Sequence, residues 1–387
     1  MPQVNEAMQT LTAQWYNAMV TGLGLSDQEF QIYQGPSSFV MTSQSLWNML
    51  NAVPPTAVNN YFSPGQVNNF SSDYNLILGA LIGTSDADFQ SCMGDYFTKW
   101  QTYFEKNKPS PFTAKTVSDV FRQWAMVNAP GKTGCVTGLT KFFIDPINLA
   151  IVKFADADGK YAWDKTIDAL QLALAGGASK SFTLNSKTGS SDLKHTWAKA
   201  SGSVLFDLFS FGGSGSYDKI TTKAISAGLI IQADFEKFTT FAAGPLAQPN
   251  STDPVLKDFL PWYESAALAK AYSTKDNTVW NKQSPITWEK AFGGTGFLQR
   301  IAAALVAAEG ISVTITSTAT FSSSEQTEIR EAAKSGFWPF FRASGESGST
   351  NTVTFDAKGS FTLNNEIPLG NPQVLGILQE PMSRLFG

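Results

Sequence analysis

The chain has 387 residues, of which 16% are charged, against about 25% in an average soluble domain, and its formal net charge is −4. A weakly acidic chain without a basic stripe lacks the electrostatic attraction that nucleic-acid binding requires, so nucleic acid is excluded as a partner. The length predicts about two or three domains, each large enough to bury its own core.

The N-terminal sequence predicts an amphipathic helix, because Leu11, Trp15 and Ala18 recur at helical spacing. The first residues lack the positive and apolar regions of a Sec signal peptide, and no run reaches the roughly 18 apolar residues of a transmembrane helix. The chain is therefore expected to be cytoplasmic, or released by a non-classical route.

Residues 1–155 are predicted to form a mostly helical domain, because apolar-periodic segments alternate there with Pro, Gly and Asn turns. The two cysteines, Cys92 and Cys135, fall in this region. They are too few for a disulfide framework or a Cys-based zinc site. We favour two buried free thiols, with one disulfide as the alternative.

The rest of the chain contains one long pattern twice. The first copy runs from Trp163 to Leu246 and the second from Trp288 to Leu369. Each copy contains, in the same order, a glycine, a Ser-Gly pair, an aromatic cluster, a Ser-Gly-Ser segment and a Phe-Thr pair. We therefore predict a first α/β repeat unit at 156–247, a linker with a helix at 248–284, and a second unit with a C-terminal tail at 285–387.

The second copy shows the clearest strand signals. Apolar and polar residues alternate from Ile311 to Phe321 and again from Thr352 to Leu363, which predicts two half-buried strands. Between them, Ser322 to Lys334 is predicted to be a short helix. Its N-cap is either Ser322, which would form a capping box with Glu325, or Ser324, which would not.

The predicted fold class is α+β. A mostly helical N-terminal region is followed by two duplicated strand-helix-loop-strand units, which form a pseudo-twofold sheet packed against helices. Parallel and antiparallel pairing within each unit both remain open, because the connections are long enough for either.

Catalytic motifs are scarce in the sequence. His195 is the only histidine, so a His-rich metal site is excluded, and its helical context predicts a structural role. Nucleotide-binding glycine patterns and the Gly-x-Ser-x-Gly elbow do not occur, so no cofactor is predicted. Asp156 and Asp158 are weak candidates for a cation site, although Phe154 and Lys165 occupy the first and last positions that an EF-hand would need.

Two aromatic clusters are the candidate binding sites. Packing in the core is the favoured interpretation of both, and contact with a membrane, a glycan surface or another subunit is the alternative. The candidate residues are Phe206, Phe209 and Phe211 in the first copy, and Phe337, Trp338, Phe340 and Phe341 in the second.

The sequence favours a non-enzymatic protein that binds a partner or assembles with itself. Low charge, Thr- and Asn-rich strand faces and few edge lysines are typical of such an interface. The alternative is a pore-forming, toxin-like protein, because Ser/Thr-rich alternating strands of about 9–11 residues suit a membrane barrel. An enzyme that works with carboxylates, such as a glycosidase, is the third hypothesis.

Overall fold

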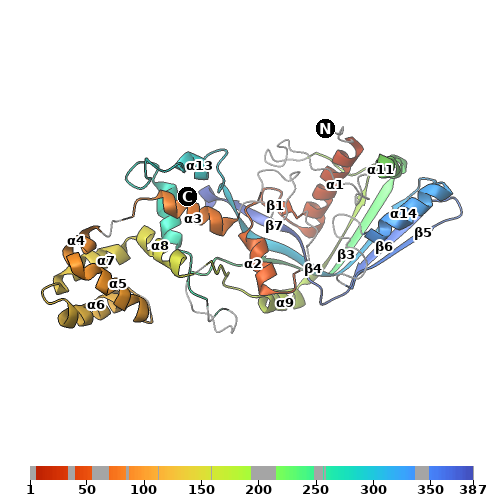
Figure 1. Ribbon diagram of the computed structural model, residues 1–387. Coiled ribbons are helices and arrows are strands. Elements are labelled where there is room, and N and C mark those ends of the chain that lie inside the picture. The colour runs from red at the N-terminus through yellow and green to blue at the C-terminus, as the bar shows by residue number, and fades with distance from the viewer. Residues whose placement is uncertain are drawn as a thin grey trace. The chain divides into compact units, whose positions relative to one another are not determined.

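The computed structural model describes residues 6–33, 40–54, 69–83, 87–111, 113–157, 159–192, 215–247, 256, 259–335 and 348–386 (Figure 1). The chain forms two compact units, each built from three segments. The sheet unit contains Met1–Phe70, Lys165–Gly244 and Arg300–Pro381, and the helical unit contains Ser71–Asp164, Pro245–Gln299 and Met382–Gly387. The described residues combine helices with an antiparallel sheet, which confirms the α+β class.

These units differ from the consecutive blocks expected from the sequence. The N-terminal helix α1 (Glu6–Leu23) belongs to the sheet unit rather than to a helical domain of residues 1–155. It packs against strand β2 (Ala178–Asn185), where the rings of Trp15 and Phe182 lie 5.2 Å apart. An amphipathic pattern shows that a helix buries one face, but it carries no information about which distant segment covers that face.

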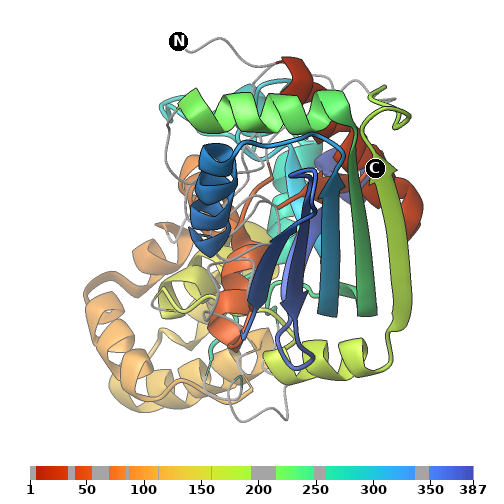
Figure 2. The same ribbon diagram turned by 90° about the vertical axis from the view of Figure 1, so that its right-hand side faces the viewer.

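In the described residues the sheet has seven strands, and every pairing among them is antiparallel. The order is β1-β7-β4-β3-β2, and β6 and β5 extend the sheet from β4. Figure 2 shows five neighbouring strands of this sheet side by side, in the order β5, β6, β4, β3 and β2. The remaining bounds are β1 Phe30–Ile32, β3 Leu229–Ala242, β4 Arg300–Ser317, β5 Thr350–Phe355, β6 Phe361–Ile367 and β7 Gln373–Pro381.

Strand β4 changes partner at Gly310. Its first half pairs with β7 and its second half, from Ile311, pairs with β6. Gly310 has a φ of 62°, and a Cβ at this position would lie 2.7 Å from the Cβ of Glu236. Glycine is therefore required where the strand passes from one neighbour to the other.

The main core lies on one face of this sheet. The buried side of β4 presents Ile311, Val313 and Ile315, as the alternating sequence predicts. Helices α1, α11 (Gly215–Ala227) and α14 (Ser323–Ser335) contribute to the same buried cluster. Two further helices of the sheet unit are α2 (Ser43–Asn51) and α9 (Ile167–Ala175).

Helix α14 confirms the predicted capping box. The Glu325 carboxylate accepts the Ser322 N–H at 2.7 Å, and the Ser322 hydroxyl accepts the Glu325 N–H at 3.4 Å. The predicted strand from Thr352 to Leu363 is wrong, because it is a hairpin of β5 and β6. Asp356 stabilises the turn, since its Oδ1 accepts the N–H groups of Lys358 and Ser360.

The helical unit contains two groups of helices. One packs around an aromatic cluster that includes Phe89, Trp100, Phe121 and Trp124, with the Trp100 and Phe121 rings 5.0 Å apart. The other surrounds Trp262, whose ring lies 6.0 Å from that of Tyr74. The bounds are α3 Phe70–Ala80, α4 Ala87–Met93, η1 Gly94–Tyr96, α5 Phe97–Lys106, α6 Ala114–Asn128, η2 Thr133–Cys135, α7 Val136–Ile144, α8 Pro146–Asp156, α12 Ser265–Ser273, α13 Trp288–Phe292 and α15 Met382–Phe386.

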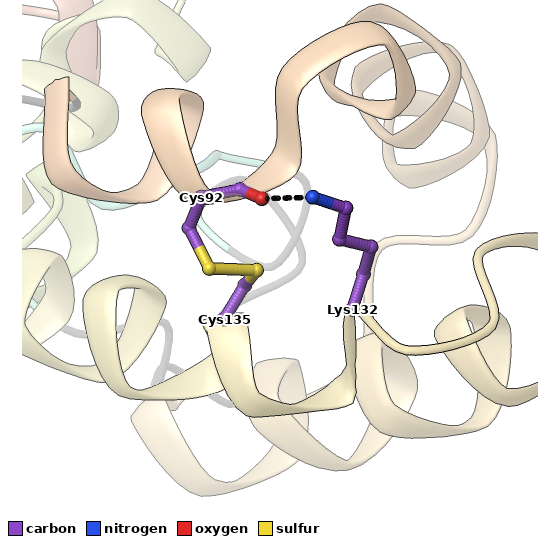
Figure 3. The surroundings of a disulfide bond; sticks show 3 residues. All are labelled: Cys92, Lys132 and Cys135. Atoms are coloured by element: carbon purple, nitrogen blue, oxygen red, sulfur yellow. Dashed lines mark hydrogen bonds between the residues drawn. A yellow bond between two sulfur atoms is a disulfide. The ribbon is translucent and has the colours of Figure 1, made fainter.

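Cys92 and Cys135 form a disulfide, so the interpretation as two free thiols is wrong (Figure 3). The bond joins α4 to η2, and the Lys132 ammonium donates to the Cys92 carbonyl at 2.7 Å beside it. The cysteines are 43 residues apart in the sequence, and only the packing of α4 beside α7 brings them together.

Replacing both cysteines by serine should lower the free energy of unfolding of the helical unit by roughly 4 kcal/mol, because the 43-residue link no longer restricts the unfolded chain. Urea unfolding followed by tryptophan fluorescence measures the change. A reductant should lower the midpoint of the parent protein and leave the double variant unchanged. Equal midpoints for parent and variant would contradict the stabilising role.

Candidate binding surface on the sheet

All seven candidate residues of the aromatic clusters lie outside the residues that the structure describes: Phe206, Phe209, Phe211, Phe337, Trp338, Phe340 and Phe341. His195 and Asp158 also lie outside them. Binding by these clusters therefore stays a prediction.

Of the candidate site residues, Asp156 is the one that the structure describes. It is the last residue of α8, and its Oδ1 forms an ion pair with the Lys108 Nζ at 2.6 Å. Within the described ranges, no three His, Cys, Asp or Glu side chains are grouped so that they could hold a metal ion. The arrangement around Asp156 is therefore an ion pair between two segments of the helical unit.

The sheet presents a polar face opposite the main core. On this face the register aligns three rows of residues across β2, β3, β4, β6 and β5. We call these fifteen residues the polar face: Thr183, Gln232, Thr314, Asn364 and Thr352 in one row, Ser181, Asp234, Ser312, Glu366 and Thr350 in the second, and Asn185, Ile230, Thr316, Thr362 and Thr354 in the third.

No residue of the polar face is buried. Its chemistry is mostly hydroxyl and amide, with two carboxylates, Asp234 and Glu366, and one aliphatic residue, Ile230, which is 39% exposed. Thr314 donates to the Asn364 Oδ1 at 2.9 Å, so neighbouring strands are also joined through their side chains. The face lacks the basic residues that bind phosphate and the aromatic rings on which sugars stack.

Strand β5 is the edge of the sheet next to this face. It pairs only with β6 and contains no charged residue and no proline. Its register with β6 is regular from Thr350 to Phe355, so no bulge interrupts the edge. Its side chains alternate between exposed and half-buried. An edge strand of this kind offers backbone hydrogen-bonding groups to a further strand.

The opposite edge, at β2, is protected in several ways. A register shift between Ala178 and Lys180 interrupts its pairing with β3, and Lys180 places a charge on the strand. Helix α1 packs against β2, and its Gln14 amide donates to the carbonyls of Ser186 and Gly189, just after the strand. The third edge, β1, has only three residues. Among the described strands, β5 is therefore the edge with neither a register shift nor a charged residue, although α14 packs against it and the Ala333 carbonyl of α14 accepts from the Asn351 amide.

Comparison of the chain with protein-family models, curated proteins and solved structures finds no match. The geometry of the site is therefore the basis of the functional argument. In the described part of the chain, no single helix has the length and apolarity to cross a membrane. The two segments Thr133–Lys141 and Pro146–Asp156, with a sharp bend between them, are long and apolar enough only when taken together.

Among the acidic residues that the structure describes, Asp73 has the largest resolved change in pKa. It lies in α3 of the helical unit. Asp73 is 5% exposed, and its Oδ2 has no hydrogen-bond partner. Burial raises the pKa of this carboxyl to about 7. Its place in the first turn of a helix is a common one for an acid, so the sequence alone did not reveal the burial.

Asp73 should make the protein less stable as the pH rises. The folded state keeps the proton up to about pH 7, whereas the unfolded chain releases it near the ordinary pKa of 3.8, so stability falls between these two values. Asp73→Asn should raise the melting temperature at pH 8 and have little effect at pH 4. Calorimetry at both pH values tests this, and an equal effect at both would contradict it.

Proposed function

We propose that the protein is a non-enzymatic interaction protein that assembles with itself through the sheet unit. The observation that carries this proposal is the regular, uncharged edge of β5, beside a polar face whose residues are all exposed or half-buried. Backbone groups at an open edge favour the addition of another strand, and a second copy of the chain supplies one of matching chemistry. The absence of an enzymatic activity is part of the proposal.

An internal duplication of residues 163–246 and 288–369 is also proposed. In its favour, each segment contains an antiparallel strand pair, β2 with β3 and β4 with β6. Because β2 and β4 both run antiparallel to β3, they share one direction. A doubling would therefore relate the segments by a shift across the sheet rather than by a twofold axis.

Self-association should depend on the β5 edge. We expect sedimentation velocity to show the parent protein associating as its concentration rises, and Thr352→Lys combined with Thr354→Lys to remain monomeric, because lysines at an edge oppose strand pairing. Thr183→Lys is the matched control, since it adds a lysine to the same face on the protected strand β2. A parent protein that stays monomeric up to high micromolar concentration would exclude the proposal.

Membrane pore formation is the second candidate function. It is favoured by two long connections, residues 186–228 between β2 and β3 and residues 318–349 between β4 and β5, which contain α11 and α14. If these connections refolded as hairpins, they would extend the ladders of β3 and β4, which are adjacent in the sheet. The strands already have 14 and 18 residues, more than the roughly 9–11 that cross a bilayer.

In this second candidate the ion pair between α11 and α14 restrains refolding. Lys223 donates to both carboxylate oxygens of Glu325 at 2.9 Å, and this interaction lowers the pKa of Glu325. We expect Glu325→Gln to release dye from phosphatidylcholine–phosphatidylserine vesicles up to about fivefold faster than the parent, since an exposed ion pair contributes up to about 1 kcal/mol. Glu328→Gln, also on α14, is the control. No release by any variant across lipid compositions and pH values would remove this function.

A further inference from the structure

We infer that β5 pairs antiparallel with β5 of a second copy, around a twofold axis that passes through Thr354. This inference rests on the proposed self-assembly and specifies its interface. The dimer would contain one continuous sheet with both polar faces on the same side. Strand pairing of this kind needs backbone groups that point outwards, a register that matches side chains, and no repulsive charge at the axis.

The backbone of β5 meets the first requirement. The Asp356 N–H donates to the Ser360 carbonyl at 2.9 Å, at the turn between β5 and β6. Antiparallel ladders alternate, so the even-numbered residues of β5 direct their N–H and C=O groups towards β6. Val353 and Phe355 therefore direct theirs towards the open edge.

The side chains select one register. When Val353 lies opposite Phe355 of the second copy, the two residues exchange both backbone hydrogen bonds, and the twofold axis repeats the pair. Both side chains are half-buried against the main core, so each pair joins apolar groups. Aromatic and β-branched residues directly opposite each other stabilise a sheet by about 0.2–1 kcal/mol per pair.

Alternative registers match less well. A shift of the second strand by two residues places Asn351 opposite Phe355, and a shift by four residues places it opposite Val353. The amide of Asn351 is already bonded within its own copy, because its Nδ2 donates to the Ala333 carbonyl and its Oδ1 accepts from Asn365. These registers therefore set a polar side chain with internal partners against an apolar one.

The polar face fits the same register. Thr354 lies on the twofold axis, opposite Thr354 of the second copy. The two residues form a pair without backbone hydrogen bonds, in which the Cα atoms of antiparallel strands are about 4.5 Å apart. Threonine side chains opposite each other are favourable on an exposed sheet face. Because both copies use the same edge, pairing leaves no β5 edge for a third copy, and the assembly closes as a dimer of twice 41.9 kDa.

A cysteine scan reads the register directly. We expect Thr354→Cys to form a disulfide-linked dimer on mild oxidation, since about 4.5 Å between Cα atoms suits a disulfide. Thr352→Cys is the matched control on the same face. In this register its two copies lie roughly 13 Å apart along the strands, too far for a bond. The native cysteines are paired with each other and do not compete.

The outcomes separate the inference from the proposed function. Non-reducing electrophoresis should show mainly dimer for Thr354→Cys and mainly monomer for Thr352→Cys and Val353→Cys, with sedimentation confirming a dimer before oxidation. Cross-linking at position 352 or 353 instead would overturn the register while leaving self-assembly intact. Association without cross-linking at any of the three positions would overturn the β5 interface. A monomer in every experiment would overturn the proposed function as well.

Discussion

The fold of the sheet unit depends on one strand, β4. It pairs with β3 from Leu229↔Ser317 to Ala242↔Ala304, and on its other side with β7 and then β6. The outer strands β2, β5 and β1 are attached only through β3, β6 and β7, respectively. The 18-residue strand β4 therefore sets the register of the strands on both of its sides. At Gly310 its pairing changes from β7 to β6.

Local patterns predicted the elements of this strand and of α14. Alternation from Ile311 identified which side of β4 is buried, and the Ser322–Glu325 capping box identified the start of the helix. The same alternation hid the turn between β5 and β6. Phe355 and Phe361 are both apolar and in phase across the turn, so a hairpin and one long strand give the same periodic signal.

Contacts between distant segments could not be predicted in this way. The polar face is assembled from five strands that span residues 181 to 366, and its rows exist only because of the strand register. The sequence did identify Thr314, Thr316, Thr352, Thr354 and Thr362 as the polar side of strands. It could not show that these threonines share one surface, that α1 protects β2, or that Cys92 meets Cys135, since all three depend on tertiary packing.

The two sides of the sheet unit differ in what they could contribute to the proposed pairing at the β5 edge. The apolar side is covered by α1, α11 and α14, so a strand added at β5 meets hydrophobic contact only from half-buried Val353 and Phe355. The polar side remains hydrated, and its hydroxyl groups give no hydrophobic reason for two faces to stack. In the proposed dimer, association is restricted to the edge itself, where backbone geometry would specify direction and register. Such an interface would close on a single partner rather than grow, because the other edges are short or protected.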